Sequence, residues 1–435
     1  MFDLRKMLVI SSFGFASGLP YILIFSTLSA WLRDVGINLS IIGFFSWIVL
    51  TYSLKFLWAP AIDRFSIPIL NKFGKRKSWI IFSQLIIIFS LLILSTINPT
   101  EKILAFVVIA FFVAFFGSIQ DIAIDAFRIE YANLSDQGNL AAAYQFGYRL
   151  AILVATSAAL IIADVYDWSF AYLLMSSLML IGLAAAIFSK KEKTNNDLKV
   201  LNFSEAFINP LKDFSKRYGL TLASMILLVV ATYRLTDIVM GPMANPFYID
   251  MGYTLTQIGS VIKVVALIAS ICGVFIGGIL IKNFGLYYSL LAGAFLVMFT
   301  NLFFSYVAVT QDVFLNIANL EIPLNLSIVV SLDSIAAGIV GTVNITFLTS
   351  LVSKKYTAVQ YALLTSFMML PGKFFGGFSG LIANYFQTIS NLNFGWMFFY
   401  IFTSLLSILP LYLIYLNKDL SLIHISEPTR NESIS

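Results

Sequence analysis

Two aspartates stand four residues apart at the end of a strongly apolar segment. The stretch ILAFVVIAFFVAFFG (residues 103–117) runs directly into SIQDIAIDAFR (residues 118–128), which contains Asp121 and Asp125. Side chains at positions i and i+4 share one face of a helix. A charged side chain at the centre of a bilayer costs about 2.5–3.5 kcal/mol on insertion scales unless it is partnered or hydrated. We therefore expect these acids either to end a membrane helix or to act within one.

The composition places the chain among polytopic membrane proteins. Of its 435 residues, 59% are hydrophobic and 11% are charged, and the mean hydropathy is +0.90. A soluble domain has roughly 45–50% apolar and about 25% charged residues. The single Cys272 and the single His424 cannot form an internal disulfide or a Cys/His metal cluster. We expect no metal, no other cofactor and no nucleic-acid partner, because the basic residues that raise the pI lie in loops.

Hydropathy predicts an all-α protein that crosses the bilayer twelve times. A spanning helix needs about 20 mainly apolar residues. The segments that satisfy this requirement are 8–30, 41–59, 79–97, 103–129, 140–163, 168–189, 219–249, 256–281, 286–308, 326–352, 357–384 and 394–416.

The lysines and arginines predict the orientation. With the N-terminus in the cytoplasm, almost all of the 27 Lys and Arg residues face inward, and the outer loops hold only Arg33 and Lys102. Such a bias follows the positive-inside rule of membrane proteins. The remaining basic residues lie within spans: Lys55, Arg149, Arg234, Lys263 and Lys373. We predict that both termini lie in the cytoplasm.

A charged connection divides the chain into two halves. The sequence predicts one six-helix bundle over residues 1–189, a cytoplasmic linker over 190–218, a second bundle over 219–417 and a polar tail over 418–435. The stretch FSEAFINPL (residues 203–211) has the pattern of an amphipathic helix on the membrane surface. A plain flexible linker explains the same residues equally well, so both interpretations stay open.

Two inner loops resemble each other in corresponding positions of the halves. After the second span come APAIDRF (59–65) and GKRK (74–77), and after the eighth comes GGILIKNFG (277–285). Such loops can brace neighbouring helices as the halves move, although an ordinary basic loop is the simpler interpretation. The predicted gating residues are Asp63, Arg64, Gly74 and Arg76. Six spans, a basic connection and six more spans are typical of the major facilitator architecture.

Charges within the spans are sorted by sign. The acids lie on the fourth, seventh and tenth spans: Asp121, Asp125, Asp237 and Asp333. The bases lie on the second, fifth, eighth and eleventh, except Arg234 on the seventh. In the facilitator architecture these helices surround a central cavity, so we predict acid–base pairs between neighbouring helices there. Alternatives are a purely structural, charge-balanced cluster and, for Asp125, a salt bridge to Arg128 at the helix end.

Several motifs together resemble one transporter family. They are GFASGLP (14–20), AWLRDVG (30–36), LKFLWAPAIDR (54–64), QDIAIDA (120–126), GYRL (147–150), PFYIDMGYTLTQIG (246–259), YTAVQYALLTS (356–366) and GGFSG (376–380). In this order they are similar to the AmpG muropeptide permeases of the bacterial inner membrane, over residues 14–399. Two features depart from the usual pattern: SIPILNKF (66–73) lengthens the first inner loop, and residues 310–325 form a longer outer loop.

The resemblance implies proton-coupled import of anhydromuropeptides by a monomer. Such a cargo is a glycopeptide with hydroxyls, amides and carboxylates, and arginine binds carboxylates with two parallel hydrogen bonds. The expected substrate-binding residues are Gln120, Gln145, Tyr148, Arg149, Arg234, Asn245, Tyr248, Lys263 and Lys373. The expected proton carriers are Asp121, Asp125, Asp237 and Asp333, with Asp121 as the first choice because it lies deepest on its span.

Two other classes of function remain open from sequence alone. One is a facilitator for another anionic solute, such as acetyl-coenzyme A or a siderophore. The other is a membrane enzyme or sensor, which requires a convergent nucleophile, a metal site or a large soluble domain. The sequence contains none of these, so we expect no enzymatic activity.

Overall fold

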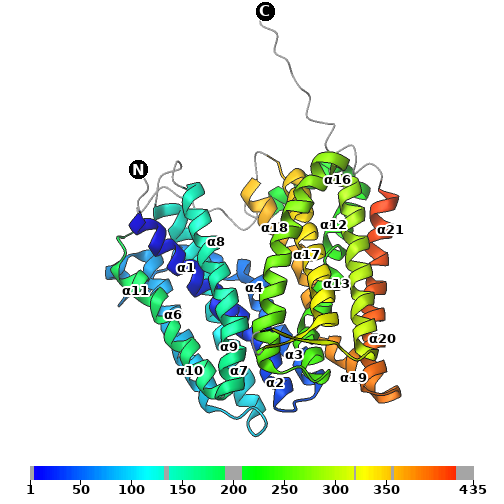
Figure 1. Cartoon of the computed structure of the whole chain (residues 1–435). Coiled ribbons are helices and arrows are strands. Elements are labelled where there is room, and N and C mark those ends of the chain that lie inside the picture. Colours follow the sequence, from blue (N-terminus) through cyan, green and yellow to red (C-terminus); the bar gives the residue numbers. More distant parts are fainter. Residues whose placement is uncertain (1–3, 132–136, 192–207, 318–319, 354–356, 418–435) are drawn as a thin grey trace, which may run out of the picture.

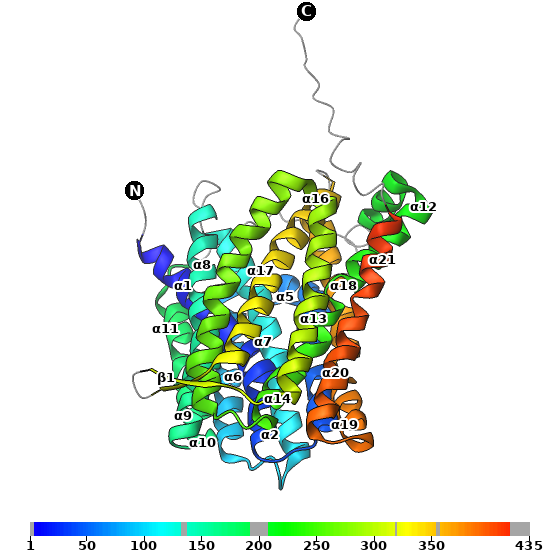
Figure 2. The same ribbon diagram turned by 45° about the vertical axis from the view of Figure 1, so that its right-hand side comes forward.

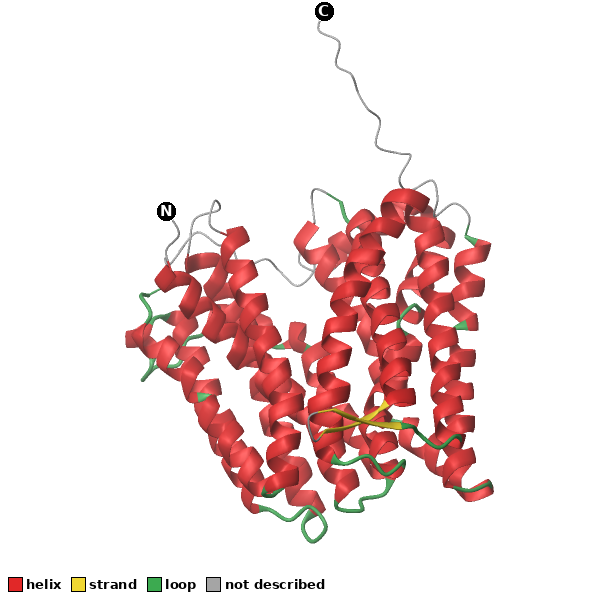
Figure 3. Cartoon of the chain, in the orientation of Figure 1, coloured by secondary structure: helices red, strands yellow, loops and turns green. Residues whose placement is uncertain are grey.

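The computed structural model describes residues 4–131, 137–191, 208–317, 320–353 and 357–417. These residues form two bundles of long helices that stand side by side (Figure 1), with one small pair of strands (Figure 3). The beginning of α1 and the end of α21 lie at the same end of the molecule, as the turned view in Figure 2 also shows. We call this end the terminal face and the opposite end, which carries the strands, the hairpin face.

The first bundle consists of helices that are repeatedly interrupted by short π- or 3-10 turns. In chain order they are α1 (Leu4–Ile22), η1 (Leu23–Thr27), α2 (Leu28–Asp34), α3 (Leu39–Phe45), η2 (Ser46–Val49), α4 (Leu50–Ser53), η3 (Lys55–Leu57), α5 (Ala59–Arg64), η4 (Asn71–Phe73), α6 (Lys75–Thr96), α7 (Ile103–Tyr131), α8 (Gln137–Leu153), η6 (Val154–Ala158), α9 (Ala159–Val165), α10 (Trp168–Leu178) and α11 (Leu180–Phe188).

The second bundle is built in the same way. Its elements are α12 (Asn209–Thr232), α13 (Leu235–Met240), η8 (Gly241–Met243), α14 (Ala244–Asp250), α15 (Leu255–Gln257), η9 (Ile258–Ile262), α16 (Lys263–Val309), β1 (Phe314–Ile317), β2 (Leu320–Pro323), α17 (Leu324–Leu351), α18 (Thr357–Gly376), α19 (Ser379–Ile389), α20 (Leu392–Leu406) and α21 (Ile408–Leu416). The 3-10 turn η8 contains Pro242 and α14 contains Pro246, the two prolines of the predicted seventh span.

The helices account for the twelve predicted crossings. Within the described residues, ten continuous helical stretches are long and apolar enough to span a bilayer. One of them, Leu255–Val309, has 55 residues and reverses direction at Gly285, where φ is 78°, so it crosses twice. The pair α18 and α19 supplies the remaining crossing. Large apolar side chains such as Leu104 and Phe275 stay exposed on the outside, as a lipid environment requires.

Glycines with positive φ turn the chain in the two inner loops that resemble each other. Gly74 has φ of 129° and Gly285 has φ of 78°. A residue with a Cβ rarely adopts this conformation, so glycine fits these positions at little steric cost. Both turns lie at the terminal face, between the second and third spans and between the eighth and ninth.

The predicted long outer loop contains an antiparallel hairpin. Strands β1 and β2 pair with Phe314 opposite Pro323. The Asp312 carboxylate accepts hydrogen bonds from the backbone N–H groups of Asn325 and Leu326, at the start of α17. It also accepts one from the Tyr253 hydroxyl at 2.7 Å. Burial and this carboxylate raise the pKa of Tyr253 above its ordinary value, so the phenol remains a donor and ties the hairpin to the turn before α15.

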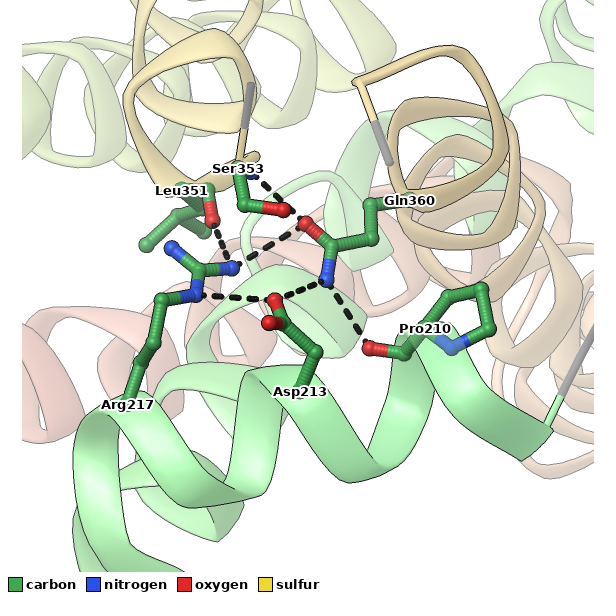
Figure 4. Close-up of polar contacts among 6 residues, drawn as sticks. All are labelled: Pro210, Asp213, Arg217, Leu351, Ser353 and Gln360. Atoms are coloured by element: carbon green, nitrogen blue, oxygen red, sulfur yellow. Dashed lines mark hydrogen bonds and ion pairs between the residues drawn. The ribbon is translucent and has the colours of Figure 1, made fainter. Parts of the chain in front are cut away.

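A polar cluster fixes the connection between the halves to the second bundle (Figure 4). In the first turns of α12, Asp213 lies 3.1 Å from Arg217, and Arg217 donates to the backbone carbonyl of Leu351. The buried Gln360 of α18 donates to Asp213 and to the carbonyl of Pro210, and accepts from the N–H of Ser353. The chain then turns at Gly219, where φ is 73°. Residues 203–207 of the predicted amphipathic stretch lie outside the described residues.

Candidate functional site

Asp121 of α7 pairs with a lysine of the second span. Its carboxylate lies 3.9 Å from the ammonium of Lys55 in η3. The sequence predicted acid–base pairs between neighbouring helices without fixing which base pairs with Asp121. Lys55 is that partner, and it lies in the 3-10 turn η3, which interrupts the second span. Arg149, a base on another neighbouring span, is exposed on α8. Arg149 lies next to Tyr148 and acts on that phenol electrostatically.

Tyrosines surround the Asp121 carboxylate. The charge of Asp121 acts on four of them, which come from the first, second and fifth spans: Tyr21, Tyr52, Tyr144 and Tyr148. The Tyr52 hydroxyl packs directly against the backbone of Gly117, one turn before Asp121 on α7, where a Cβ would clash with it. The Tyr21 and Tyr52 rings contact each other edge to face at 4.9 Å. These phenols supply hydroxyls of the kind that bind sugars and amides.

Lys373 connects this cluster to the second bundle. It belongs to α18, and its side chain is buried, with 7% exposure. Its ammonium lies 5.6 Å from the centre of the Tyr21 ring and 3.5 Å from the carbonyl of Val49, both in the first bundle. Asp121 and Lys55 both act on Lys373 electrostatically. The Asp121 carboxylate therefore pairs with a lysine of its own half and lies within electrostatic range of a lysine of the other half.

The second bundle carries its charges differently. Arg234 lies at the junction of α12 and α13, and its guanidinium is 3.9 Å from the Asp237 carboxylate one turn later. Asp333 of α17 accepts a hydrogen bond from the Thr300 hydroxyl at 3.0 Å. Asp237 lies near enough to act on Asp333. This half thus brings two carboxylates together, and its arginine pairs within its own helix.

An unpaired lysine completes the second cluster. The ammonium of Lys263, at the start of α16, lies 5.7 Å from the centre of the Tyr248 ring. A cation over an aromatic face is attracted by the ring quadrupole. Among the salt bridges found within the described residues, none includes Lys263. The charge of Arg234 also acts on Tyr21, so Tyr21 lies between the two clusters.

Other predicted site residues have structural contacts. Gln120 is fully buried and donates to the Ala16 carbonyl at 2.7 Å, joining α7 to α1. Asn245 of α14 donates to the Ser26 carbonyl of the other half at 2.6 Å. Asp125 lies 3.8 Å from Arg128, the helix-end pair that the sequence analysis left open. Gln145 is exposed on α8, near Tyr148.

The predicted gating loop is tied to the end of α7. Arg76 donates two hydrogen bonds to one carboxylate oxygen of Glu130, at 3.0 and 2.8 Å, and is 6% exposed. Gly74 forms the turn before α6. The backbone of Asp63 and Arg64 ends α5, and their side chains lie outside the described set. The fully buried Lys77 donates to the Ser189 carbonyl at 2.6 Å, a contact that the sequence did not predict.

Sequence reasoning missed several residues of the first cluster. Lys55 was recognised as a charge within a span but was not assigned to the site, and Tyr21, Tyr52 and Tyr144 were not singled out. In the sequence these three residues stand out only as tyrosines, with a polar hydroxyl, within otherwise apolar spans. Within the ranges that the structure describes, no three His, Cys, Asp or Glu side chains gather as metal ligands would.

Comparisons with known proteins agree with this architecture. Residues 8–376 match the family model described as Major Facilitator Superfamily. The transporter AmpG 4 of Rickettsia felis is 33% identical over 418 residues, covering 94% of this chain and 95% of the relative. The anhydromuropeptide permease of Escherichia coli is 28% identical over 405 residues, covering 93% of this chain and 78% of the relative.

Solved structures support the same fold. A D-xylose–proton symporter superposes with a TM-score of 0.70 at 13% identity, covering 95% of this chain and 98% of the symporter. The nucleoside transporter NupG superposes with a TM-score of 0.67 at 11% identity, covering 95% of this chain and 99% of that one. The chain is therefore a polytopic membrane transporter for a small molecule, and it belongs to the Major Facilitator Superfamily as an AmpG-like member.

Proposed function

We propose that this transporter imports anhydromuropeptides from the periplasm to the cytoplasm and is driven by protons. The cargo is proposed from the likeness to the named permease of Escherichia coli and the transporter of Rickettsia felis. The excess of basic residues inside the spans supports an anionic cargo, since peptide carboxylates need cationic partners away from water. In this proposal the protein lies in the inner membrane, works as a monomer and has its terminal face in the cytoplasm.

One observation supports proton coupling most strongly. The Asp121 carboxylate lies 3.9 Å from Lys55 of its own half and also interacts electrostatically with Lys373 of the other half. Protonation of Asp121 removes the negative charge that offsets these two ammonium groups. The proton therefore changes an electrostatic contact between the two bundles, which is the contact that must change when the bundles rock.

The cargo is proposed to bind between the two polar clusters. Its carboxylates would approach Lys55 and Lys373, and the exposed Arg149 and the partly buried Arg234 offer planar guanidinium groups to further carboxylates. The tyrosines around Asp121 and Tyr248 in the second half would contact the sugar hydroxyls and peptide amides. The bundle opens alternately to either side, and the proton leaves Asp121 when that carboxylate faces the cytoplasm.

Uptake into proteoliposomes tests the function. Purified protein is reconstituted, a gradient with acid outside is imposed, and labelled anhydro-disaccharide tripeptide is added. We expect accumulation above the external concentration, abolished by a protonophore. A failure to accumulate this cargo in vesicles that are shown to hold correctly folded protein would refute the proposal.

The runner-up function is a facilitator for another anionic solute, because the basic side chains do not by themselves select a glycopeptide. The same vesicles are therefore offered labelled acetyl-coenzyme A and a labelled anionic siderophore. Accumulation of either one without accumulation of the anhydromuropeptide would establish the alternative.

A further inference from the structure

The turns at the hairpin face repeat one sequence pattern in both halves. Residues 31–43 read WLRDVGINLSIIG and residues 247–259 read FYIDMGYTLTQIG. The pattern places Asp34 with Asp250 and Gly36 with Gly252, and the two glycines have φ of 83° and 85°. Each turn thus leaves one span and enters the next with the same backbone geometry, between α2 and α3 and between α14 and α15.

Each repeated aspartate accepts a hydrogen bond from a tryptophan of its own half. The Trp168 indole N–H donates to Asp34 at 2.7 Å. The Trp396 indole N–H donates to Asp250 at 2.9 Å. The first spans of each half are in this way tied to the last, and up to this point the two halves are equivalent.

The residue before the aspartate breaks the equivalence. It is Arg33 in the first half and Ile249 in the second. The Arg33 guanidinium crosses to the other half and donates to both oxygens of Asp250, at 2.5 and 2.7 Å. The Asp250 side chain is only 6% exposed. A two-bond arginine–carboxylate pair with a buried acid is among the strongest side-chain contacts in proteins. No arginine among the described residues forms such a pair with Asp34.

Further contacts between the halves lie on the same side of the molecule. A Cβ on Gly380 of α19 would clash with the Leu39 carbonyl, and one on Gly259 would lie 2.8 Å from the Ser157 carbonyl. These glycines let helices of opposite halves approach closely. Asp164 accepts a hydrogen bond from the Thr256 N–H of the other half at 2.9 Å. The hairpin face is therefore closed, with the Arg33–Asp250 pair as its charged connection.

We infer that the Arg33–Asp250 pair holds the hairpin face shut and must break before cargo can enter from that side. Trp396 keeps the Asp250 carboxylate oriented toward the arginine, and Ile249 cannot supply a second pair at the equivalent position. The closed state therefore depends on one bidentate contact, and losing it shifts the balance toward an open hairpin face. The inference uses the proposed import only to call this face the side of entry.

Distance measurements by electron paramagnetic resonance test the inference without any cargo. Spin labels are placed at Lys102→Cys and Asn393→Cys, which lie exposed at the hairpin face in opposite halves, in a Cys272→Ala background. Without substitutions in the pair, we expect one short distance. Arg33→Gln and Asp250→Asn should raise the ratio of long to short distances by about tenfold or more, since truncating one partner of a buried charge pair is strongly unfavourable to the contact.

Asp34→Asn is the matched control, because it alters the repeated aspartate and its tryptophan contact without touching the Arg33–Asp250 pair. It should leave the distances unchanged. Arg33→Lys keeps the charge but loses the planar guanidinium that makes two parallel bonds, so it should give an intermediate ratio of long to short distances. If Asp250→Asn does not fold, this variant serves as the second test of the pair. Unchanged distances in Arg33→Gln, or an equal shift in Asp34→Asn, would overturn the inference. Because no cargo is present, the result is independent of whether anhydromuropeptides are the substrate.

Discussion

The two bundles hold their intramembrane acids in different surroundings. In the first, Asp121 lies 3.9 Å from Lys55 on another span and is also influenced by Lys373 of the opposite bundle. In the second, Asp237 pairs with Arg234 of its own helical segment, and Asp333 bonds to the Thr300 hydroxyl. A proton on Asp121 therefore weakens its pair with Lys55 and its attraction to a lysine of the other bundle, whereas a proton on Asp237 weakens a pair within its own helical segment.

This difference assigns unequal roles to two intramembrane acids, one in each bundle. We expect Asp121 to couple proton movement to rocking of the halves. The Arg234–Asp237 pair should instead shape the binding surface of the second half. The following substitutions test the difference, in order of decreasing expected effect.

Asp121→Asn should abolish accumulation driven by a pH gradient. Asparagine keeps the shape and much of the hydrogen bonding of the aspartate side chain, but its amide does not take up or release a proton at the pH values of the assay. Uptake with acid outside should fall to the level of empty vesicles, while counterflow exchange of cargo survives. Accumulation at the wild-type level would remove Asp121 from the coupling role.

Lys373→Met should weaken uptake by about tenfold. Methionine fills the buried volume without a charge, so the first bundle loses its cationic partner from the second. An effect of this size corresponds to about 1.4 kcal/mol. Initial uptake rates at matched protein levels measure it, with Lys282→Met, at the terminal face, as a matched surface control. Equal rates for the two variants would contradict the role of Lys373.

Arg149→Lys should reduce uptake by several-fold, chiefly through a higher half-saturation concentration. The charge stays, but the planar fork that binds a carboxylate with two bonds is lost. Concentration-dependent uptake separates weaker binding from slower turnover. If even Arg149→Ala transports normally at normal expression, Arg149 does not bind the cargo.

Asp237→Asn should reduce uptake by about twofold and leave proton coupling intact, because pairs one turn apart on a helix contribute a few tenths of a kcal/mol each. The ratio of the final cargo accumulation to the imposed pH gradient measures proton coupling, whereas the initial uptake measures the transport rate. A loss of accumulation as complete as that of Asp121→Asn would show that the second bundle carries the proton.

Asp125→Asn should change uptake by less than about twofold. Its carboxylate is 43% exposed and lies 3.8 Å from Arg128. Exposed pairs of this kind contribute about 0–1 kcal/mol. The same uptake assay checks this variant, and a defect comparable to that of Asp121→Asn would mean that both acids of the opening pair share the proton.

Hydropathy predicted the spans because the bilayer imposes a local requirement on each helix. The segment predicted at 103–129 is the helix Ile103–Tyr131, and the long outer loop is where the hairpin β1–β2 forms. Every span must satisfy its own backbone and cover itself with apolar side chains, so length and composition suffice. The turn at Gly285 likewise lies in the basic inner loop GGILIKNFG (277–285) that the sequence indicated.

The partners inside the site could not be predicted in the same way. The choice of Lys55 over Arg149 for Asp121 depends on the rotation of each helix about its axis, which packing between helices decides. The packing of Tyr52 against Gly117 is one such contact. The Arg33–Asp250 pair joins residues far apart in the chain, and only the comparison of residues 31–43 with 247–259 hints at that region.

Substrate-induced proton movement tests the central claim most directly. A pH-sensitive dye is enclosed in proteoliposomes without an imposed gradient, and anhydro-disaccharide tripeptide is added outside. The account predicts that the lumen acidifies with the wild-type protein and with Asp237→Asn, and that it does not with Asp121→Asn. Acidification by Asp121→Asn equal to that of the wild type would contradict the account.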